Sequence, residues 1–278
     1  MKKTILWSLA FIITVAAAIY QRHTGPTYPK KVDVTLNNNA YELKLVRSLA
    51  LDERSEVRLN ISDTSIKAKL YHKRFKSDEE YQVTDFSQRN ETRNEGLFAA
   101  IPQQPAAGKI QYYLEITDLN GPKTYFRESP IVIRFKGGVP AFILIPHILF
   151  MFVAMLFSTL AGLMAVIKYP LYKKYGIWTL ILFIAGGMIL GPIVQYYAFG
   201  DLWTGVPFGW DLTDNKTLLA LVFWILAVVM NWKREKPLYT VLAAFILLLI
   251  YSIPHSLFGS ELDYSSGQVT QGIILSFF

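Results

Sequence analysis

Residues 139–167 read VPAFILIPHILFMFVAMLFSTLAGLMAVI, and no Asp, Glu, Lys or Arg interrupts this stretch. A helix needs about 20 consecutive apolar residues to cross the hydrocarbon core of a bilayer. The stretch is long enough, and it therefore predicts a membrane-spanning helix. It decides the fold class of the chain, because the segments on either side must be arranged around a membrane.

Similar apolar runs occur elsewhere in the chain. Three follow the first, at 177–200, 217–232 and 238–258, and together these four runs predict a four-helix transmembrane domain over 137–260. With 52% hydrophobic residues, the chain is more apolar than an ordinary soluble protein. Another run, at 4–20, follows two lysines, so residues 1–27 fit either a signal anchor or a cleaved signal peptide.

The charges of the short loops predict how these helices are oriented. Segments 168–175 and 231–237 are rich in Lys and Arg, whereas segment 195–216 between them is mainly acidic. Because Lys and Arg concentrate on the cytoplasmic side, we expect the N-terminus inside and the tail 261–278 outside. The chain has no cysteine, so its outer part contains no disulfide, which is compatible with a bacterial inner membrane and its periplasmic side.

The segment 28–136 has the alternating pattern of β-strands. Ile110, Tyr112, Leu114 and Ile116 alternate with polar residues, and asparagine- and glycine-containing turns separate such runs. We expect an extracytoplasmic all-β domain, an immunoglobulin- or fibronectin-like β-sandwich. The expected strands are 32–36, 41–49, 56–62, 65–75, 81–86, 96–101, 108–118 and 123–135.

Two of the four histidines lie within the apolar runs. His147 and His255 each follow a proline, and both are expected near the outer ends of their helices. Two neutral imidazoles at one depth can ligate a metal ion or both axial positions of a haem iron. Alternatively, each is a polar residue hydrogen-bonded to a neighbouring helix. We expect His23 and His72 to be ordinary surface residues.

The loop 203–216, WTGVPFGWDLTDNK, is expected over the same outer face. Trp203 and Trp210 fit an aromatic belt at the headgroups, or a flat surface on which a planar ligand packs. Asp214 is expected to cap the following helix. For Asp211, the sequence leaves both roles, capping and ligand binding, as alternatives.

The sequence Trp203, then Trp210-Asp211, with His147 before it and His255 after it, resembles the cytochrome c biogenesis haem-handling membrane proteins. The resemblance implies non-covalent binding of haem b, with His147 and His255 as iron ligands and Trp203, Trp210 and Asp211 beside the cofactor. Electron transfer or haem handling would be the function. The chain departs from that family in having fewer tryptophans in the loop, fewer spans and an added β-domain.

Other functions find less support in the sequence. No catalytic motif was found, so an enzyme is not expected. The net charge of +7 is spread along the chain, which argues against nucleic acid as a partner. No Asp, Glu, Lys or Arg lies in the four later apolar runs, which disfavours a transport path. The alternative to haem binding is a scaffold or assembly subunit whose β-sandwich binds a membrane or periplasmic protein.

Overall fold

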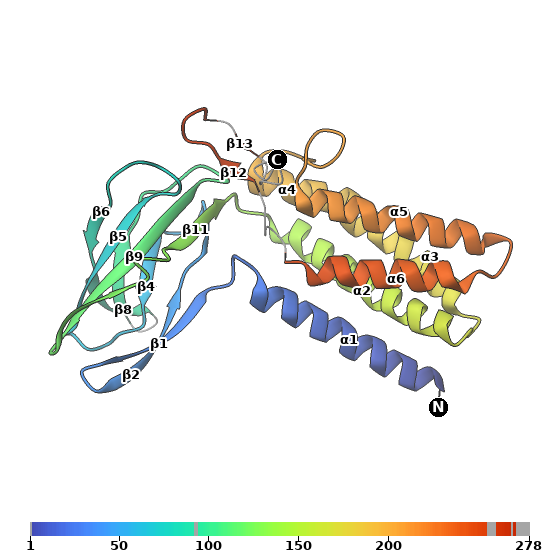
Figure 1. The fold of residues 1–278 in the computed structure, drawn as a ribbon, viewed down its shortest axis with the longest axis horizontal. Helices are drawn as coiled ribbons and strands as arrows, with labels where there is room; N and C mark the ends of the chain where they lie inside the picture. The colour runs from blue at the N-terminus through green and yellow to red at the C-terminus, as the bar shows by residue number, and fades with distance from the viewer. Residues whose placement is uncertain (1, 92–93, 255–259, 268, 271–278) are drawn as a thin grey trace. The chain divides into compact units, whose positions relative to one another are not determined.

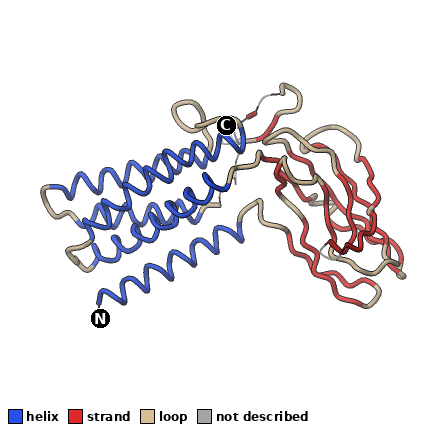
Figure 2. The backbone as a smooth tube through the Cα atoms, turned by 180° about the vertical axis from the view of Figure 1, so that it is seen from behind, coloured by secondary structure: helices blue, strands red, loops and turns tan. Residues whose placement is uncertain are grey.

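The computed structural model describes residues 2–91, 94–254, 260–267 and 269–270. Its contacts divide the chain into two units. The strand unit comprises Thr27–Gly138 together with Glu261–Thr270, and the helical unit holds the helices and their connecting loops. Helices and strands are thus segregated along the chain (Figure 1, Figure 2).

The helical unit contains four helical segments that are long and apolar enough to cross a membrane. The length and composition of these segments are compatible with insertion into a membrane and with lipid contact, as the prediction of a helical membrane part requires. Many large apolar side chains on these helices are exposed, as lipid-facing residues would be. The four segments are α1 (Lys2–Thr24), α2 (Ala141–Val166), the continuous α3 (Tyr172–Phe183), η1 (Ile184–Leu190) and α4 (Gly191–Phe199), and α5 (Leu212–Trp232).

The last apolar helix, α6 (Pro237–Ser252), is shorter than predicted. At about 1.5 Å per residue it is roughly 24 Å long, less than the roughly 30 Å of a hydrocarbon core. The predicted run continued to 258, but Ile253 is extended, with ψ of 119°. The cause is Pro254, since a residue before proline avoids the helical conformation.

Small residues allow the helices to pack closely. Alanines from α2, α5 and α6 surround the buried Trp224, and they let the helix backbones approach one another. A second cluster joins α1 to α2, with Leu6 and Ala10 against Leu160 and Met164. The helical unit therefore includes α1 as a packed element.

The described strands of the strand unit pair antiparallel, except for the parallel pair of β3 and β11. The larger sheet has the order β3-β11-β9-β5-β6, with β10 paired to β9, and a smaller sheet has the order β4-β8-β7. The pairs β1-β2 and β12-β13 form sheets of their own. The bounds are β1 (Lys30–Leu36), β2 (Asn39–Leu45), β3 (Ser48–Ala50), β4 (Glu56–Leu59), β5 (Lys67–Arg74), β6 (Gln82–Asp85), β7 (Ser87–Glu91), β8 (Asn94–Ala100), β9 (Lys109–Asp118), β10 (Gly121–Tyr125), β11 (Ile131–Lys136), β12 (Glu261–Leu262) and β13 (Val269–Thr270).

The predicted alternation is confirmed by burial. The apolar positions of β4, β5, β9 and β11 belong to one core, to which β1, β2 and β8 also contribute. The predicted turn after β1 is also confirmed, because Asn37 and Asn38 both have positive φ and join Leu36 to Asn39 in a two-residue hairpin. Asparagine tolerates this conformation better than most residues, so the local sequence sets the register of this hairpin.

We expect Ile133→Ala to destabilise the strand unit by about 2–5 kcal/mol, because it opens a cavity at a fully buried position of β11. Hydrogen exchange of β9 and β11 peptides in the detergent-solubilised full chain measures the effect. Val83→Ala, at a position 51% exposed, is the control. Equal exchange in the two variants would contradict the assignment of Ile133 to the core.

Candidate functional site

His147 lies about two turns into α2, as predicted, and its ring contacts the π-helical segment η1. Its Nδ1 is 2.9 Å from the carbonyl oxygen of Gly186. A carbonyl can only accept a hydrogen bond, so Nδ1 carries the proton and Nε2 of the neutral ring has the free lone pair. The same carbonyl accepts from the N–H of Gly191, which is the i to i+5 bond of a π-helix.

This geometry suits a histidine that ligates a metal or haem iron. Such ligands usually donate their other ring N–H to a carbonyl or carboxylate, which fixes the ring and the tautomer. Among the described residues, no group of three or more His, Cys, Asp or Glu side chains is placed to hold a metal ion. His255 lies outside the described residues, so its pairing with His147 stays a prediction.

Asp211, rather than Asp214, is the N-cap of α5. Its side chain accepts from the backbone N–H groups of Thr213 and Asp214 at 2.8 and 3.2 Å. The prediction that Asp214 caps the helix was wrong, because the helix begins at Leu212, several residues before the apolar run. Asp211 therefore has a structural role that accounts for its place after Trp210.

Asp214 instead ties the loop 203–216 to the helices. Its Oδ2 accepts from the Thr204 backbone N–H at 2.6 Å and from the amide of Gln195 on α4 at 3.1 Å. Gly205 allows this approach, because a Cβ there would lie 2.7 Å from the Cβ of Asp214. The loop thus folds back on the first turn of α5 through buried polar contacts.

Lys216 is a buried cation for which the sequence patterns gave no signal. Its Nζ donates to the carbonyl of Ile253, at the C-terminal end of α6, at 2.8 Å. A cation is favourable there, since the C-terminal end of a helix carries negative partial charge. The apolar run that predicts this helix begins at 217 and leaves Asp214 and Lys216 outside it, whereas the N-cap at Asp211 includes both residues in α5.

The two tryptophans of the loop differ in exposure. Trp203 is half-buried, and its indole N–H donates to the carbonyl of Val206 at 3.1 Å. Trp210 is 59% exposed and Phe208 is 81% exposed. The hydrogen bond of His147 goes to Gly186 on η1 and not to this loop, so among the described residues it does not join the predicted histidine and tryptophan positions into one site.

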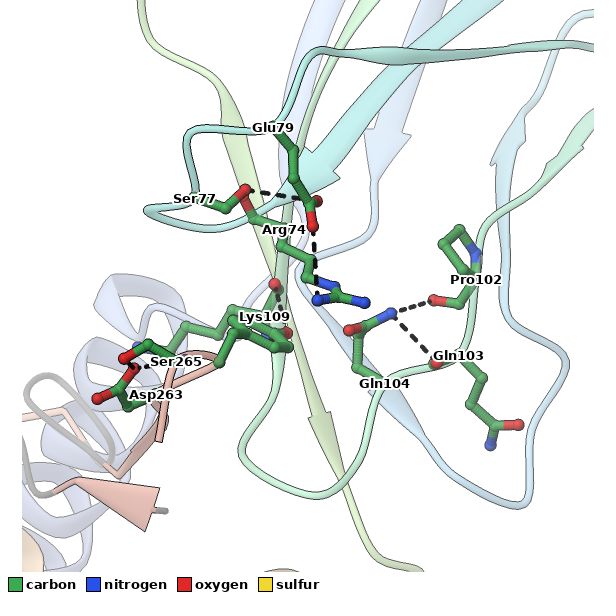
Figure 3. Close-up of polar contacts among 10 residues, drawn as sticks. Arg74, Ser77, Glu79, Pro102, Gln103, Gln104, Lys109, Asp263 and Ser265 are labelled. Atoms are coloured by element: carbon green, nitrogen blue, oxygen red, sulfur yellow. Dashed lines mark hydrogen bonds and ion pairs between the residues drawn. The ribbon is translucent and has the colours of Figure 1, made fainter. Parts of the chain in front are cut away.

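The strand unit contains a second polar site, around the start of β9 (Figure 3). The hydroxyl of Tyr264 accepts from the backbone N–H of Lys109 and donates to its carbonyl, both at 2.9 Å. The ammonium of Lys109 lies 2.7 Å from the carboxylate of Glu261. Residues 261–264 are thereby fastened to β9 within the strand unit.

The acidic groups of this segment titrate at lower pH than usual. Burial raises the pKa of Glu261, but hydrogen bonds and charge from Lys109 and Lys76 outweigh this and lower the pKa below its ordinary value of 4.5. Hydrogen bonds from Ser265 and Ser266 lower the pKa of Asp263 to about 2. Both groups are therefore anions at neutral pH.

A cavity of about 130 Å³ opens beside this segment, lined mainly by polar side chains that include His72, Arg74, Glu79 and Gln104. The expectation that His72 is a surface residue was wrong: it is only 3% exposed, and its Nε2 is 3.0 Å from the hydroxyl of Thr84. His72 shares the face of β5 that carries Leu70, which points into the core. Burial lowers the pKa of His72, so its ring is neutral at pH 7.

Comparison of the chain with protein-family models, with curated proteins and with solved structures finds no match in any of the three.

We expect Asp211→Ala to destabilise the helical unit by about 0.5–2 kcal/mol, because two N–H groups at the start of α5 lose their acceptor. Tryptophan fluorescence during denaturation in detergent measures it. Asp211→Asn keeps the acceptor and should be nearly neutral. If the alanine and asparagine variants unfold at the same denaturant concentration, Asp211 does not act as a cap.

The attachment of β12 should weaken in acid. The pKa of Glu261 is lower in the folded chain than its ordinary value of 4.5, so its pair with Lys109 stabilises the attachment above about pH 4.5 and loses effect as the pH falls below it. Hydrogen exchange of the segment 261–267, corrected for the intrinsic pH dependence, tests this. In Glu261→Gln the segment should exchange faster at pH 7 and respond less to acid. An unchanged pH response in that variant would show that another group is responsible.

Proposed function

We propose that the chain is an integral membrane protein of the bacterial envelope that binds haem b non-covalently, for electron transfer or haem handling. The observation that carries this proposal is the hydrogen bond from Nδ1 of His147 to the Gly186 carbonyl, which leaves Nε2 as a ligand. In this proposal His147 and His255 hold the iron, which would supply one-electron chemistry when bound. Trp203 and Trp210 would contact the macrocycle.

The role of the protein's own residues is then positioning. The Gly186 carbonyl fixes the ring of His147, and the first turn of α5 fixes the loop that carries both tryptophans. Asp211, which the resemblance placed beside the cofactor, acts through the loop as the cap of α5. We propose an orientation with the basic loops inside and the strand unit in the periplasm. The packing of α1 against α2 supports an anchor rather than a removed signal peptide.

An absorption spectrum of the detergent-purified full chain, made in haem-replete cells, tests the proposal. We expect a Soret band and, after reduction with dithionite, sharp α and β bands. His147→Ala should lose or strongly shift these bands, because one axial ligand is removed. A separate His255→Ala variant tests the second ligand.

His23→Ala is the matched control, since His23 is exposed on α1. A featureless spectrum of the wild-type chain would contradict haem binding, as would bands that survive both the His147 and the His255 substitution.

A second candidate is the scaffold or assembly subunit, and the topology of the strand unit favours it. Immunoglobulin domains place strands A, B, E and D in one sheet and C, F and G in the other. If β4, β5, β7, β8, β9 and β11 are equated with B, C, D, E, F and G, the orders β4-β8-β7 and β11-β9-β5 follow that arrangement. We therefore propose an immunoglobulin-like sandwich.

The outer face of the larger sheet offers this sandwich a surface for a protein partner. Tyr71 and Tyr113 stack with ring centroids 4.6 Å apart, and Tyr81 meets Tyr113 edge to face at 4.9 Å. Exposed Val83 on β6 lies opposite Tyr71. Aromatic side chains with a polar tip are enriched at protein interfaces. Scaffold function should survive His147→Ala, whereas haem binding should not.

A further inference from the structure

We propose that the helical unit has a binding site for an anionic phospholipid between α3 and α5, at the end of the bundle that carries the basic loops. The inference is independent of haem binding and needs only that the helices lie in a membrane. It rests on a cavity, on the charges around it and on one unpaired donor.

The cavity lies between the helices and is mainly apolar. Its volume is about 100 Å³. A single water molecule needs a cavity of about 10–15 Å³, so this cavity has room for several water-sized groups. Gly176 and Ile177 line it from α3, Ala227 and Val228 from α5, and Thr240 from α6. Such a wall suits the upper part of an acyl chain and its ester linkage.

A second, more open hollow adjoins the first at the end of α5. It has a volume of about 380 Å³, and its lining includes Lys233, Arg234 and Lys236. Trp232 lines both spaces and is mostly exposed, as is common for a tryptophan at the headgroup level. An apolar cavity continued by a cationic hollow matches the two parts of a phospholipid.

The charges at this end select an anionic headgroup. Lys173 lines the cavity, and its ammonium is 3.4 Å from Glu235, whose side chain is largely exposed. Glu235 carries one negative charge, whereas Lys173 and the three basic residues of the hollow are cations, so the net charge at this end is positive. Basic pockets between transmembrane helices recognise anionic lipid headgroups through this kind of excess.

The α5–α6 loop is held in a shape that presents these cations. The side chain of Asn231 donates to the carbonyls of Ala227 and Lys236 and accepts from the Lys236 N–H. The hydroxyl of Tyr172 on α3 donates to the same side chain at 2.8 Å. The basic residues therefore lie on a turn that hydrogen bonds already hold in place. Lipid binding then requires little further ordering of the loop.

Trp224 adds an observation of a different kind. It lines the cavity and is fully buried, and its indole N–H has no hydrogen-bond partner among the described residues. A buried donor without a partner is uncommon in a folded protein. The ester carbonyl of a lipid is an acceptor of the kind that this donor lacks.

The experiment uses the detergent-purified full chain, mixed with equal amounts of phosphatidylglycerol and phosphatidylcholine, and bound lipid is counted by native mass spectrometry. We expect preferential retention of phosphatidylglycerol. Lys173→Gln should weaken its binding about fivefold, the usual contribution of one lysine near an anionic membrane surface. Val228→Phe, which fills the cavity, should weaken it as well.

Matched controls separate this site from general attraction to a basic surface. Lys174→Gln removes the same charge one residue along α3 but does not touch the cavity, and Val222→Phe enlarges an exposed apolar residue of α5. Both should bind phosphatidylglycerol like the wild type. Equal losses in Lys173→Gln and Lys174→Gln, or equal retention of the two lipids, would overturn the proposal. If Val228→Phe lowers the melting temperature, Val228→Leu, which adds less volume at the same lining position, takes its place.

Discussion

A hydrocarbon interior offers no hydrogen-bond partners, and the helical unit is shaped by the need to satisfy its polar groups internally. The need is greatest at helix ends, where backbone groups lack partners within the helix. Three side chains provide such partners: Asp211 accepts from N–H groups at the start of α5, Asn231 binds the turn into α6, and Lys216 donates to the carbonyl of Ile253 at the end of α6. These side chains fix the lengths and neighbours of the helices, and so fix where the loops can lie.

The sequence predicted the elements well wherever one pattern dominated. Alternation located the strands of the core because most buried positions are separated by less buried ones, as in Ile110, Tyr112, Leu114 and Ile116 of β9, although Tyr113 between them is buried as well. Uninterrupted apolar runs located the helices for a similar reason. The ends were less predictable, since α5 begins several residues before its apolar run and α6 ends at Ser252 although the run continues. At those points a cap and a proline outweigh hydropathy.

The candidate site was harder to predict than the fold. His147 was identified by its rarity in an apolar run, but its partner is a backbone carbonyl, which has no signature in the side-chain sequence. Asp214 and Lys216 became recognisable only once the start of α5 was known. His72 was misjudged because lysines precede and follow it on β5, although alternation places it on the opposite face from them. In each case the missing information was the direction of a side chain, which depends on register rather than composition.

The segregation of helices and strands also divides the chromophores of the protein. All six tryptophans, at positions 7, 178, 203, 210, 224 and 232, belong to the helical unit, whereas the strand unit contains tyrosines and no tryptophan. Emission excited in the indole band therefore reports on the helical unit alone, and the strand unit could unfold without altering it directly. The protein thus has a natural optical label on one half of its chain, and the melting of the two halves can be followed separately without attaching a dye.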